Sequence, residues 1–382
     1  MSVDVIVVGA GPVGLVAALT LARAGVSALV LEREPERATR SRAATFHPAT
    51  LDLLDELAVA TDLVARGLLV DRLQWRDLSG VVFAEMTMGV LAGMTGYPFR
   101  LHVEQSVLTT LLLGALEAHP EAEVRFGTPV ETVTDTGTSV RIRTACGWER
   151  ARYLIAADGA HSTVRISLGL PLPQFFYPTQ ALRIFTRSPL DELLPGLAPV
   201  TYIRDPGQSC SLLQLPDHWR LILRLPRDGP TPQYVAGLEL SELNVIDMHR
   251  YSLASGVLGA FHHGRVLFAG DAAHITSTAG GLNMNAGIHD AVDLGRTLAD
   301  VLAGHASSGA LVDWSRRRRT VLVDHVVPTS EARVVGVQDG DSAQLSAAVA
   351  ALSAIAADPQ ATRAYLVKAA MLDTVPLPVR HI

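Results

Sequence analysis

The N-terminal stretch places the strongest constraint on the fold. An apolar, branched run at residues 3–8 has the length of a buried parallel strand, and the glycine-rich hexapeptide 9–14 follows it. Residues 15–24 then predict a helix, and residues 28–31 predict a second strand that ends at Glu32. A G-x-G-x-x-G triplet between strand and helix, with an acid 18 residues beyond its third glycine, is the pattern of a dinucleotide site.

Each glycine of the triplet has a predicted task. Gly9 makes the tight turn, Gly11 lets the backbone approach a pyrophosphate, and Gly14 lets helix and strand pack closely. Free N–H groups at the helix start face the two phosphate charges, and Glu32 accepts hydrogen bonds from a ribose diol. The same segment also contributes Pro12, Val13 and Arg33 to the predicted site.

A membrane or signal segment is the alternative interpretation of this stretch, because residues 5–22 contain no charge. Three glycines and Pro12 interrupt the run, Asp4 and Arg23 flank it, and no basic region precedes it. These features favour the nucleotide site and predict no membrane span.

Composition narrows the class further. The 382 residues allow two domains or one large α/β domain, and 48% hydrophobic with 18% charged residues indicates a globular protein with a large core. A net charge of −6 gives no reason to expect nucleic acid as a partner, and we interpret the arginine run 316–319 as a solvated face or as salt-bridge partners. Cys146 and Cys210 lie far apart, which predicts a cytoplasmic protein without a disulfide framework or a metal site. We expect a monomer or a homodimer.

Two later strands end in acidic residues. Residues 152–157 lead into Asp158-Gly159, and residues 265–269 lead into Gly270-Asp271. The carboxyl end of a parallel strand is where open α/β sheets bind ligands, although Asp-Gly is also a common turn pair. A loop at 275–285 then precedes a helix at 286–302, a second place where backbone N–H groups converge.

Three motifs occur in order: the glycine fingerprint with Glu32, Asp158-Gly159-x-x-Ser162-x-Val164-Arg165, and Gly270-Asp271-Ala272-Ala273-His274. In this combination the chain resembles the FAD-dependent aromatic hydroxylases typified by para-hydroxybenzoate hydroxylase, the single-component flavoprotein monooxygenases. The resemblance extends to about Leu302 and fits the short form without a thioredoxin-like domain.

The resemblance implies an α/β fold. It consists of an FAD-binding Rossmann-type parallel sheet with helices, an antiparallel-sheet substrate domain and a helical C-terminal part. Alternating patterns within residues 170–230 agree with antiparallel strands. The expected division is 1–70, 101–169 and 245–303 for FAD binding, 71–100 and 170–244 for the substrate sheet, and 304–382 for the helical region.

The resemblance also implies a tightly but non-covalently bound FAD, with NAD(P)H as a transient reductant. Arg42 and Gln105 stand beside the FAD, Val130 lies near the adenine, and Asp271 accepts hydrogen bonds from the ribityl chain. Residues 281–285 place backbone N–H groups at the pyrimidine edge. The predicted cofactor-binding residues are Gly9, Gly11, Pro12, Val13, Gly14, Glu32, Arg33, Arg42, Gln105, Val130, Asp158, Gly159, Gly270, Asp271, Gly281, Leu282, Asn283, Met284 and Asn285.

Two departures from the family pattern leave the oxygen chemistry open. Thr278 stands where the family usually has proline, and Asn283 stands where it usually has glycine. Near Ala44, some relatives carry an acid that assists deprotonation of a phenol. We expect NAD(P)H- and O2-dependent hydroxylation of an aromatic or polyketide-like molecule through a flavin C4a-hydroperoxide. The alternatives are Baeyer–Villiger or epoxidation chemistry, an FAD-dependent reductase or dehydrogenase that does not use oxygen, and a non-catalytic FAD-binding module.

The sequence assigns no catalytic base. A phenolic substrate needs its hydroxyl deprotonated or strongly hydrogen-bonded in the transition state. For each candidate a packing or surface role is the alternative. The candidates are His47, Tyr177, Arg183, Tyr202 and His218.

Overall fold

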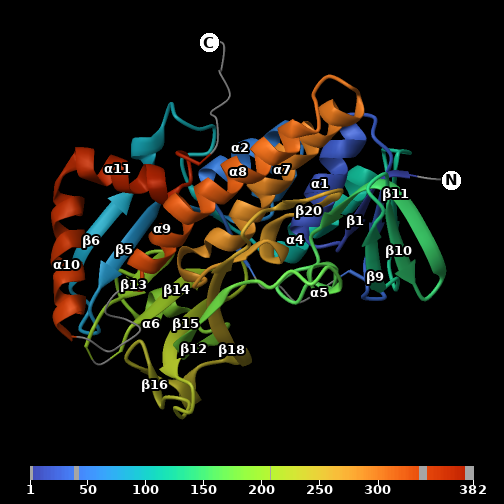
Figure 1. Cartoon of the computed structure of the whole chain (residues 1–382). Helices are drawn as coiled ribbons and strands as arrows, with labels where there is room; N and C mark the ends of the chain where they lie inside the picture. The colour runs from blue at the N-terminus through green and yellow to red at the C-terminus, as the bar shows by residue number, and fades with distance from the viewer. Residues whose placement is uncertain (1–2, 38–42, 207, 335–341, 375–382) are drawn as a thin grey trace.

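The computed structural model describes residues 3–37, 43–206, 208–334 and 342–374, and the predicted cofactor residue Arg42 lies outside them. Two eight-stranded sheets dominate the molecule, and helices lie over the first sheet and beside β6 (Val82–Thr87) of the second (Figure 1). This arrangement confirms the predicted fold class, a parallel nucleotide-type sheet combined with an antiparallel sheet and C-terminal helices.

The first sheet is built around β1 (Val3–Val8), whose apolar residues are buried from Val5 onward. β1 pairs in parallel with β2 (Ala28–Leu31) on one side and β11 (Gly147–Ala156) on the other. The strand order is β19-β20-β11-β1-β2-β8, and β10 pairs with β11 and carries β9 on its other side. The remaining strands of this sheet are β8 (Ala122–Arg125), β9 (Val130–Asp135), β10 (Val140–Thr144), β19 (His262–His263) and β20 (Val266–Phe268).

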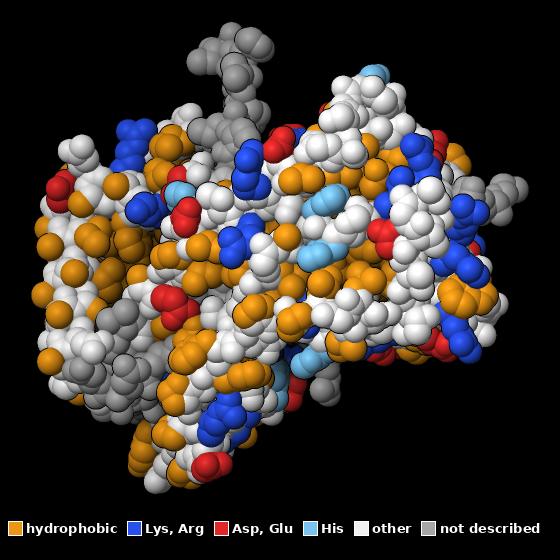
Figure 2. All heavy atoms as spheres, in the orientation of Figure 1, with side chains coloured by type: hydrophobic (Ala, Val, Ile, Leu, Met, Phe, Trp, Pro, Cys, Tyr) orange, Lys and Arg blue, Asp and Glu red, His pale blue; other side chains and the backbone are white. Residues whose placement is uncertain are grey.

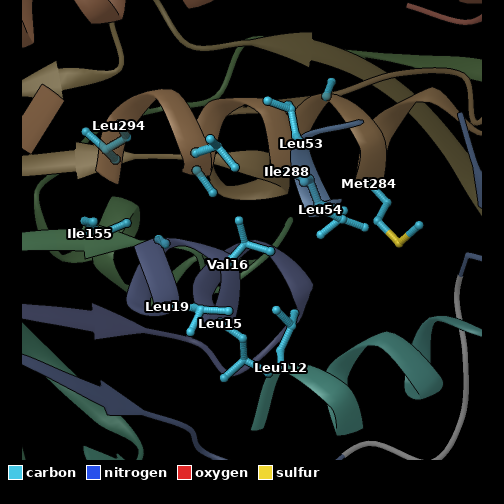
Figure 3. Close-up of a cluster of buried hydrophobic side chains, with 14 of the residues drawn as sticks. Leu15, Val16, Leu19, Leu53, Leu54, Leu112, Ile155, Met284, Ile288 and Leu294 are labelled. Carbon is cyan, nitrogen blue, oxygen red and sulfur yellow. The ribbon is translucent and has the colours of Figure 1, made fainter. Parts of the chain in front are cut away.

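Three helices cover this sheet. α1 (Pro12–Arg23) follows the glycine loop and packs against α4 (Gln105–Leu116) and α7 (Leu282–Leu302). Leucine and isoleucine side chains from all three helices fill the space between them (Figure 3). A Cβ added at Gly295 of α7 would lie 2.7 Å from Thr20, so glycine permits the close approach of α7 to α1.

The second sheet has the order β21-β18-β12-β15-β14-β13-β5-β6. The expected division places residues 245–303 with the FAD-binding part, but β18 (Val245–Val257) pairs along its length with β12 (Gln174–Thr186) in the second sheet. That assignment is wrong for β18, because this long strand continues the antiparallel ladder; the rest of the division stays a prediction. The other strands are β5 (Arg72–Arg76), β6 (Val82–Thr87), β13 (Val200–Ile203), β14 (Cys210–Gln214), β15 (Trp219–Pro226) and β21 (His274–Ile275).

Short elements connect the sheets. A three-stranded sheet of β3 (Thr45–Phe46), β7 (Arg100–His102) and β4 (Leu68–Val70) lies next to α2 (Pro48–Glu56). The loop predicted at 275–285 is shorter than expected, because α7 already begins at Leu282. The other short elements are α3 (Ala60–Val64), η1 (Met88–Leu91), α5 (Thr163–Ser167), α6 (Leu190–Leu193), β16 (Tyr234–Val235), β17 (Leu238–Glu239), η2 (Leu240–Glu242), η3 (Gly270–Ala272) and η4 (Ala279–Gly281).

α10 (Ser342–Ala357) and α11 (Pro359–Ala369) lie beside β5 and β6, at the opposite end of the molecule from β9 and β10, whereas α8 (Gly309–Val321) packs against α7 (Figure 1). α10 contains no charged residue, and hydrophobic side chains gather on the surface over it (Figure 2). Within the described residues, no helix has both the length and the apolar character needed to cross a membrane. The C-terminal elements are α8, η5 (Leu322–Val326), α9 (Val327–Ala332), α10 and α11.

Candidate functional site

A single cavity of about 1990 Å³ joins the two sheets. Its wall includes the glycine loop at the carboxyl end of β1, the start of α7, one face of the second sheet and parts of α10 and α11. Pockets for drug-sized ligands hold up to about 1,000 Å³. The cavity therefore has room for a dinucleotide and a second molecule.

The glycine loop forms a cradle for a pyrophosphate. Gly9 has a φ of 105°, and a Cβ there would lie 2.5 Å from the carbonyl oxygen of Ala157. A Cβ on Gly14 would lie 2.0 Å from the carbonyl oxygen of Gly9, whereas a Cβ on Gly11 would meet no atom within 4 Å. Gly9 and Gly14 are thus closely packed and Gly11 borders open space in the cavity, as a phosphate against the N-terminus of α1 requires.

Glu32, at the end of β2, ties the glycine loop to the second strand. Its Oε2 accepts a hydrogen bond from the backbone N–H of Ala10 at 2.7 Å, and its Oε1 accepts one from Glu34 at 3.0 Å. Glu32 and Arg33 both line the cavity, as do Pro12 and Val13. The carboxylate is therefore held beside the cradle, where a ribose would lie.

Asp158 follows β11 on the same edge of the sheet. Its Oδ2 accepts a hydrogen bond from the N–H of Val164 at 3.1 Å, and its Oδ1 is buried without a partner among the described residues. Burial raises the pKa of this carboxyl group. An acceptor without a donor in a buried position fits a hydrogen bond to a bound molecule. Gly159, Asp271, Gln105 and Val130 also line the cavity, and Gly270 packs behind it against Val13.

The start of α7 forms the wall between the cradle and the second sheet. Gly281, Leu282, Asn283 and Met284 line the cavity, and Oδ1 of Asn283 is a buried acceptor without a partner among the described residues. Asn285 lies behind this wall instead. Its side-chain amide donates to the carbonyl oxygens of Gly281 and Thr45 at 2.7 and 2.9 Å and accepts from the N–H of His47 at 3.0 Å. The side chain of Asn285 therefore holds the loop in place.

Thr278 explains one departure from the family pattern. Its φ of 64° lies in the left-handed region, whereas the proline ring holds φ near −65°. Ser277 next to it is buried and contacts two neighbouring elements, Arg224 through its carbonyl oxygen and Ser330 of α9 through its hydroxyl. The loop of this chain thus has a conformation that proline at position 278 cannot adopt.

Two of the five candidate catalytic residues, Arg183 and Tyr202, line the cavity. The other three lie outside the cavity wall. His47 is buried with Nε2 2.9 Å from the carbonyl oxygen of Gly280, and burial lowers its pKa so that it is neutral. Tyr177 donates a hydrogen bond to Glu331, and His218 lies between Asp217 and Glu104.

The strand register brings a row of side chains together across the second sheet. Arg183 of β12 is paired with His249 and Ile222, and Tyr202 of β13 is paired with Ser211 and Trp75. Ser211 is in turn paired with Ile222, so the row is continuous, and all six residues line the cavity. We call it the floor row: His249, Arg183, Ile222, Ser211, Tyr202 and Trp75.

Further arginines around the floor row are not among the sequence candidates: Arg100, Arg204, Arg220, Arg224 and Arg333 line the same cavity. The alternation of residues 219–224 places Arg220 and Arg224 on one face of a strand, and this was the only signal for them. The other three come from separate elements. No spacing in the sequence connects them.

A dinucleotide cradle and a row of aromatic and cationic side chains that line the same cavity are typical of a nucleotide-dependent enzyme. The family model described as FAD binding domain matches residues 2–328. Para-nitrophenol 4-monooxygenase from Pseudomonas sp. (strain WBC-3) is 32% identical over 367 residues, covering 89% of this chain and 88% of the relative. 6-Hydroxy-3-succinoylpyridine 3-monooxygenase from Pseudomonas putida (strain DSM 28022 / S16) is 32% identical over 349 residues, covering 86% and 87%.

Solved structures agree. The crystal structure of p-nitrophenol 4-monooxygenase from Pseudomonas putida DLL-E4 superposes with a TM-score of 0.91 at 28% identity, over 100% of this chain and 99% of that one. Anhydrotetracycline hydroxylase from Streptomyces rimosus gives a TM-score of 0.81 at 27% identity, over 100% and 78%. The chain belongs to the FAD-dependent aromatic hydroxylase family, and it is an FAD-dependent monooxygenase.

Proposed function

We propose that this enzyme uses NAD(P)H and O2 to hydroxylate a small phenol bound over the floor row. The observation that carries the proposal is the single cavity, which places the glycine cradle and the aromatic and cationic floor row in one chamber. The similarity to a nitrophenol monooxygenase over almost the full length of both chains supports a small substrate.

The residues of the cradle fit FAD. Gly11 and the N-terminus of α1 would hold the pyrophosphate, and Glu32 would hold the ribose. The start of α7 directs its N–H groups and the positive end of its dipole at the wall where the flavin ring would lie, which favours negative charge there. Bound FAD supplies the electrons and the activation of oxygen, which no side chain can supply.

The floor row would position the phenol. Three strand spacings of about 4.8 Å separate the backbones of Arg183 and Tyr202, or roughly 14 Å, which accommodates a substituted aromatic ring. Ile222 lies between them as an apolar surface. The hydroxyl of Tyr202 accepts a hydrogen bond from Arg100 at 3.1 Å, so this end of the row presents a phenol and a cation to the substrate oxygen. Apolar side chains around the ring would keep water from the reaction.

The test is coupled turnover by the FAD-loaded protein. Phenol, 4-chlorophenol and 4-nitrophenol are offered with NADH or NADPH, while coenzyme oxidation, oxygen uptake and the aromatic product are measured together. The proposal predicts that at least one phenol accelerates coenzyme oxidation and appears as a hydroxylated product. Coenzyme oxidation that no phenol accelerates, at any pH, would contradict it.

A further inference from the structure

The Tyr202 end of the cavity is a cage of aromatic and cationic side chains. The ring of Tyr202 stacks on Trp75 with centroids 5.3 Å apart, and Tyr365 of α11 meets Trp75 edge-on at 5.9 Å. Arg100 donates to the hydroxyl of Tyr202, and the guanidinium of Arg204 lies 5.4 Å from its ring centroid. We call this group, together with Arg333, the cage: Trp75, Arg100, Tyr202, Arg204, Arg333 and Tyr365.

Arg333 enters the cage from the end of α9. Its guanidinium lies against Gly280, in the loop before α7: a Cβ added at Gly280 would be 1.4 Å from Nη1. This Nη1 is buried without a partner among the described residues, and so is Nε of Arg100, whose side chain is 2% exposed. Arg333 and Tyr365 also lie beyond residues 2–328, which the family model matches. The C-terminal region therefore contributes parts of the cage that the family motif does not include.

The charges of the cage are unbalanced. Among the described residues, none of the three arginines forms an ion pair with a carboxylate. The described acids that line the cavity are elsewhere. Glu32, Glu34, Glu36, Asp158 and Asp271 lie on the cradle side, and Asp324 is exposed on η5. Buried cations are normally paired, and the part of the chain that the structure describes supplies no carboxylate to pair with these three, so a bound anion is favoured here.

The three arginines shift the pKa values of titratable groups in the cage and next to it. Burial raises the pKa of Tyr202, but Arg100 and Arg333, with Arg204, outweigh burial and lower its pKa. Burial lowers the pKa of His47, and the same two arginines, Arg100 and Arg333, lower it further. The remaining titratable neighbours are Tyr365 and the buried thiol of Cys210, which both face Arg204. A phenol in this environment is thus stabilised as its anion.

We propose that the cage binds the substrate as a phenolate already formed in solution, and that the enzyme consequently selects acidic phenols. This inference rests on the proposed function and names its substrate class. No carboxylate or charged histidine of the cage takes the proton; the proton goes to the solvent when the phenol ionises before binding. Arg333 is then a specificity-determining residue supplied by the C-terminal region.

The test measures binding without turnover. Difference spectra of the FAD-loaded protein give the Kd of phenol, 4-chlorophenol and 4-nitrophenol across a pH series without NAD(P)H. For each ligand, Kd should fall about tenfold per pH unit and level off at that ligand's own solution pKa. In addition, 4-nitrophenol bound below its solution pKa should show the absorption of the phenolate. A break at one common pH for all three ligands, or a pH-independent Kd, overturns the proposal.

Variants locate the effect. Arg333→Gln should raise the Kd of 4-nitrophenolate about tenfold, because the loss of one positive charge is expected to weaken anion binding by the equivalent of about one pKa unit. Arg333→Lys, which keeps the charge, should restore part of the lost affinity. The control is Arg316→Gln, which removes an exposed arginine paired with Asp313. Equal Kd values for Arg333→Gln and Arg316→Gln overturn the role of Arg333. If phenolates bind but no phenol is turned over, the proposed function is refuted and phenolate binding by the cage stands. If phenols are turned over but the pH at which Kd levels off does not follow each ligand's own pKa, phenolate binding by the cage is refuted and the proposed function stands.

Discussion

Restoring the usual family residue at position 278 should damage this protein. Thr278 has a φ of 64°, and a proline there would hold φ at about −65°, a difference of about 130°. The chain on both sides is fixed, because Ser277 and Gly280 are hydrogen-bonded to other elements. The loop cannot rotate freely to accept the ring. We expect Thr278→Pro to lower the free energy of unfolding by about 3 kcal/mol or more.

Thr278→Gly is the matched control. A left-handed conformation costs a residue with a Cβ about 1–2 kcal/mol, and glycine avoids this cost but loses roughly 0.5–1 kcal/mol through backbone entropy. The side chain of Thr278 is exposed, so its removal leaves no cavity. The net expectation is a gain of about 0.5–1 kcal/mol. Urea unfolding of both variants without FAD, followed by titration with FAD, measures stability and cofactor affinity separately. A Thr278→Pro variant as stable as the parent, with the same Kd for FAD, would refute the left-handed conformation.

Three other predictions concern the cradle and the buried charges. Gly14→Ala should destabilise the protein by about 1–3 kcal/mol through overpacking. Gly11→Ala should change the stability of the FAD-free protein by less than about 0.5 kcal/mol and weaken only the binding of FAD. Thermal unfolding with and without FAD distinguishes the two effects. Asp290→Asn should cost about 3–5 kcal/mol at neutral pH, because the buried carboxylate pairs with a histidine and an arginine, which lower its pKa against the effect of burial. This loss of stability should shrink as pH falls below about 4, where the carboxylate of the unfolded chain becomes protonated. The control is the half-exposed Asp293, whose substitution by Asn should cost under about 1 kcal/mol. Burial lowers the pKa of His102 to about 3, so the folded protein holds this histidine neutral while the unfolded chain takes up a proton below its ordinary pKa of 6.5. The free energy of unfolding should therefore fall as pH drops from 6.5 toward 3. In His102→Gln, urea unfolding should show a smaller dependence of this free energy on pH over the same range.

Local patterns predicted the first sheet and several helices well. The glycine hexapeptide lies between β1 and α1 as expected, and the predicted helix at 286–302 lies within α7. These elements are specified by neighbours in sequence, through strand length, helix period and glycine placement.

The site on the second sheet was not predictable in the same way. The floor row depends on lateral register among six strands, and register is set by tertiary packing. Arg100, Arg204 and Arg333 belong to separate elements, and only the fold reveals that their charges accumulate at Tyr202. The left-handed φ of Thr278 was hidden for a related reason, since threonine carries no signal for that conformation.

The central claim is that one chamber joins the flavin to a phenol and delivers oxygen to it. Isotope labelling tests it most directly: the FAD-loaded protein is supplied with NAD(P)H, 18O2 and the phenol that best accelerates coenzyme oxidation, and the product is analysed by mass spectrometry. The claim predicts a ring-hydroxylated product that carries one oxygen atom from 18O2. Coenzyme oxidation that yields only hydrogen peroxide, or a product whose new oxygen comes from water, would contradict it.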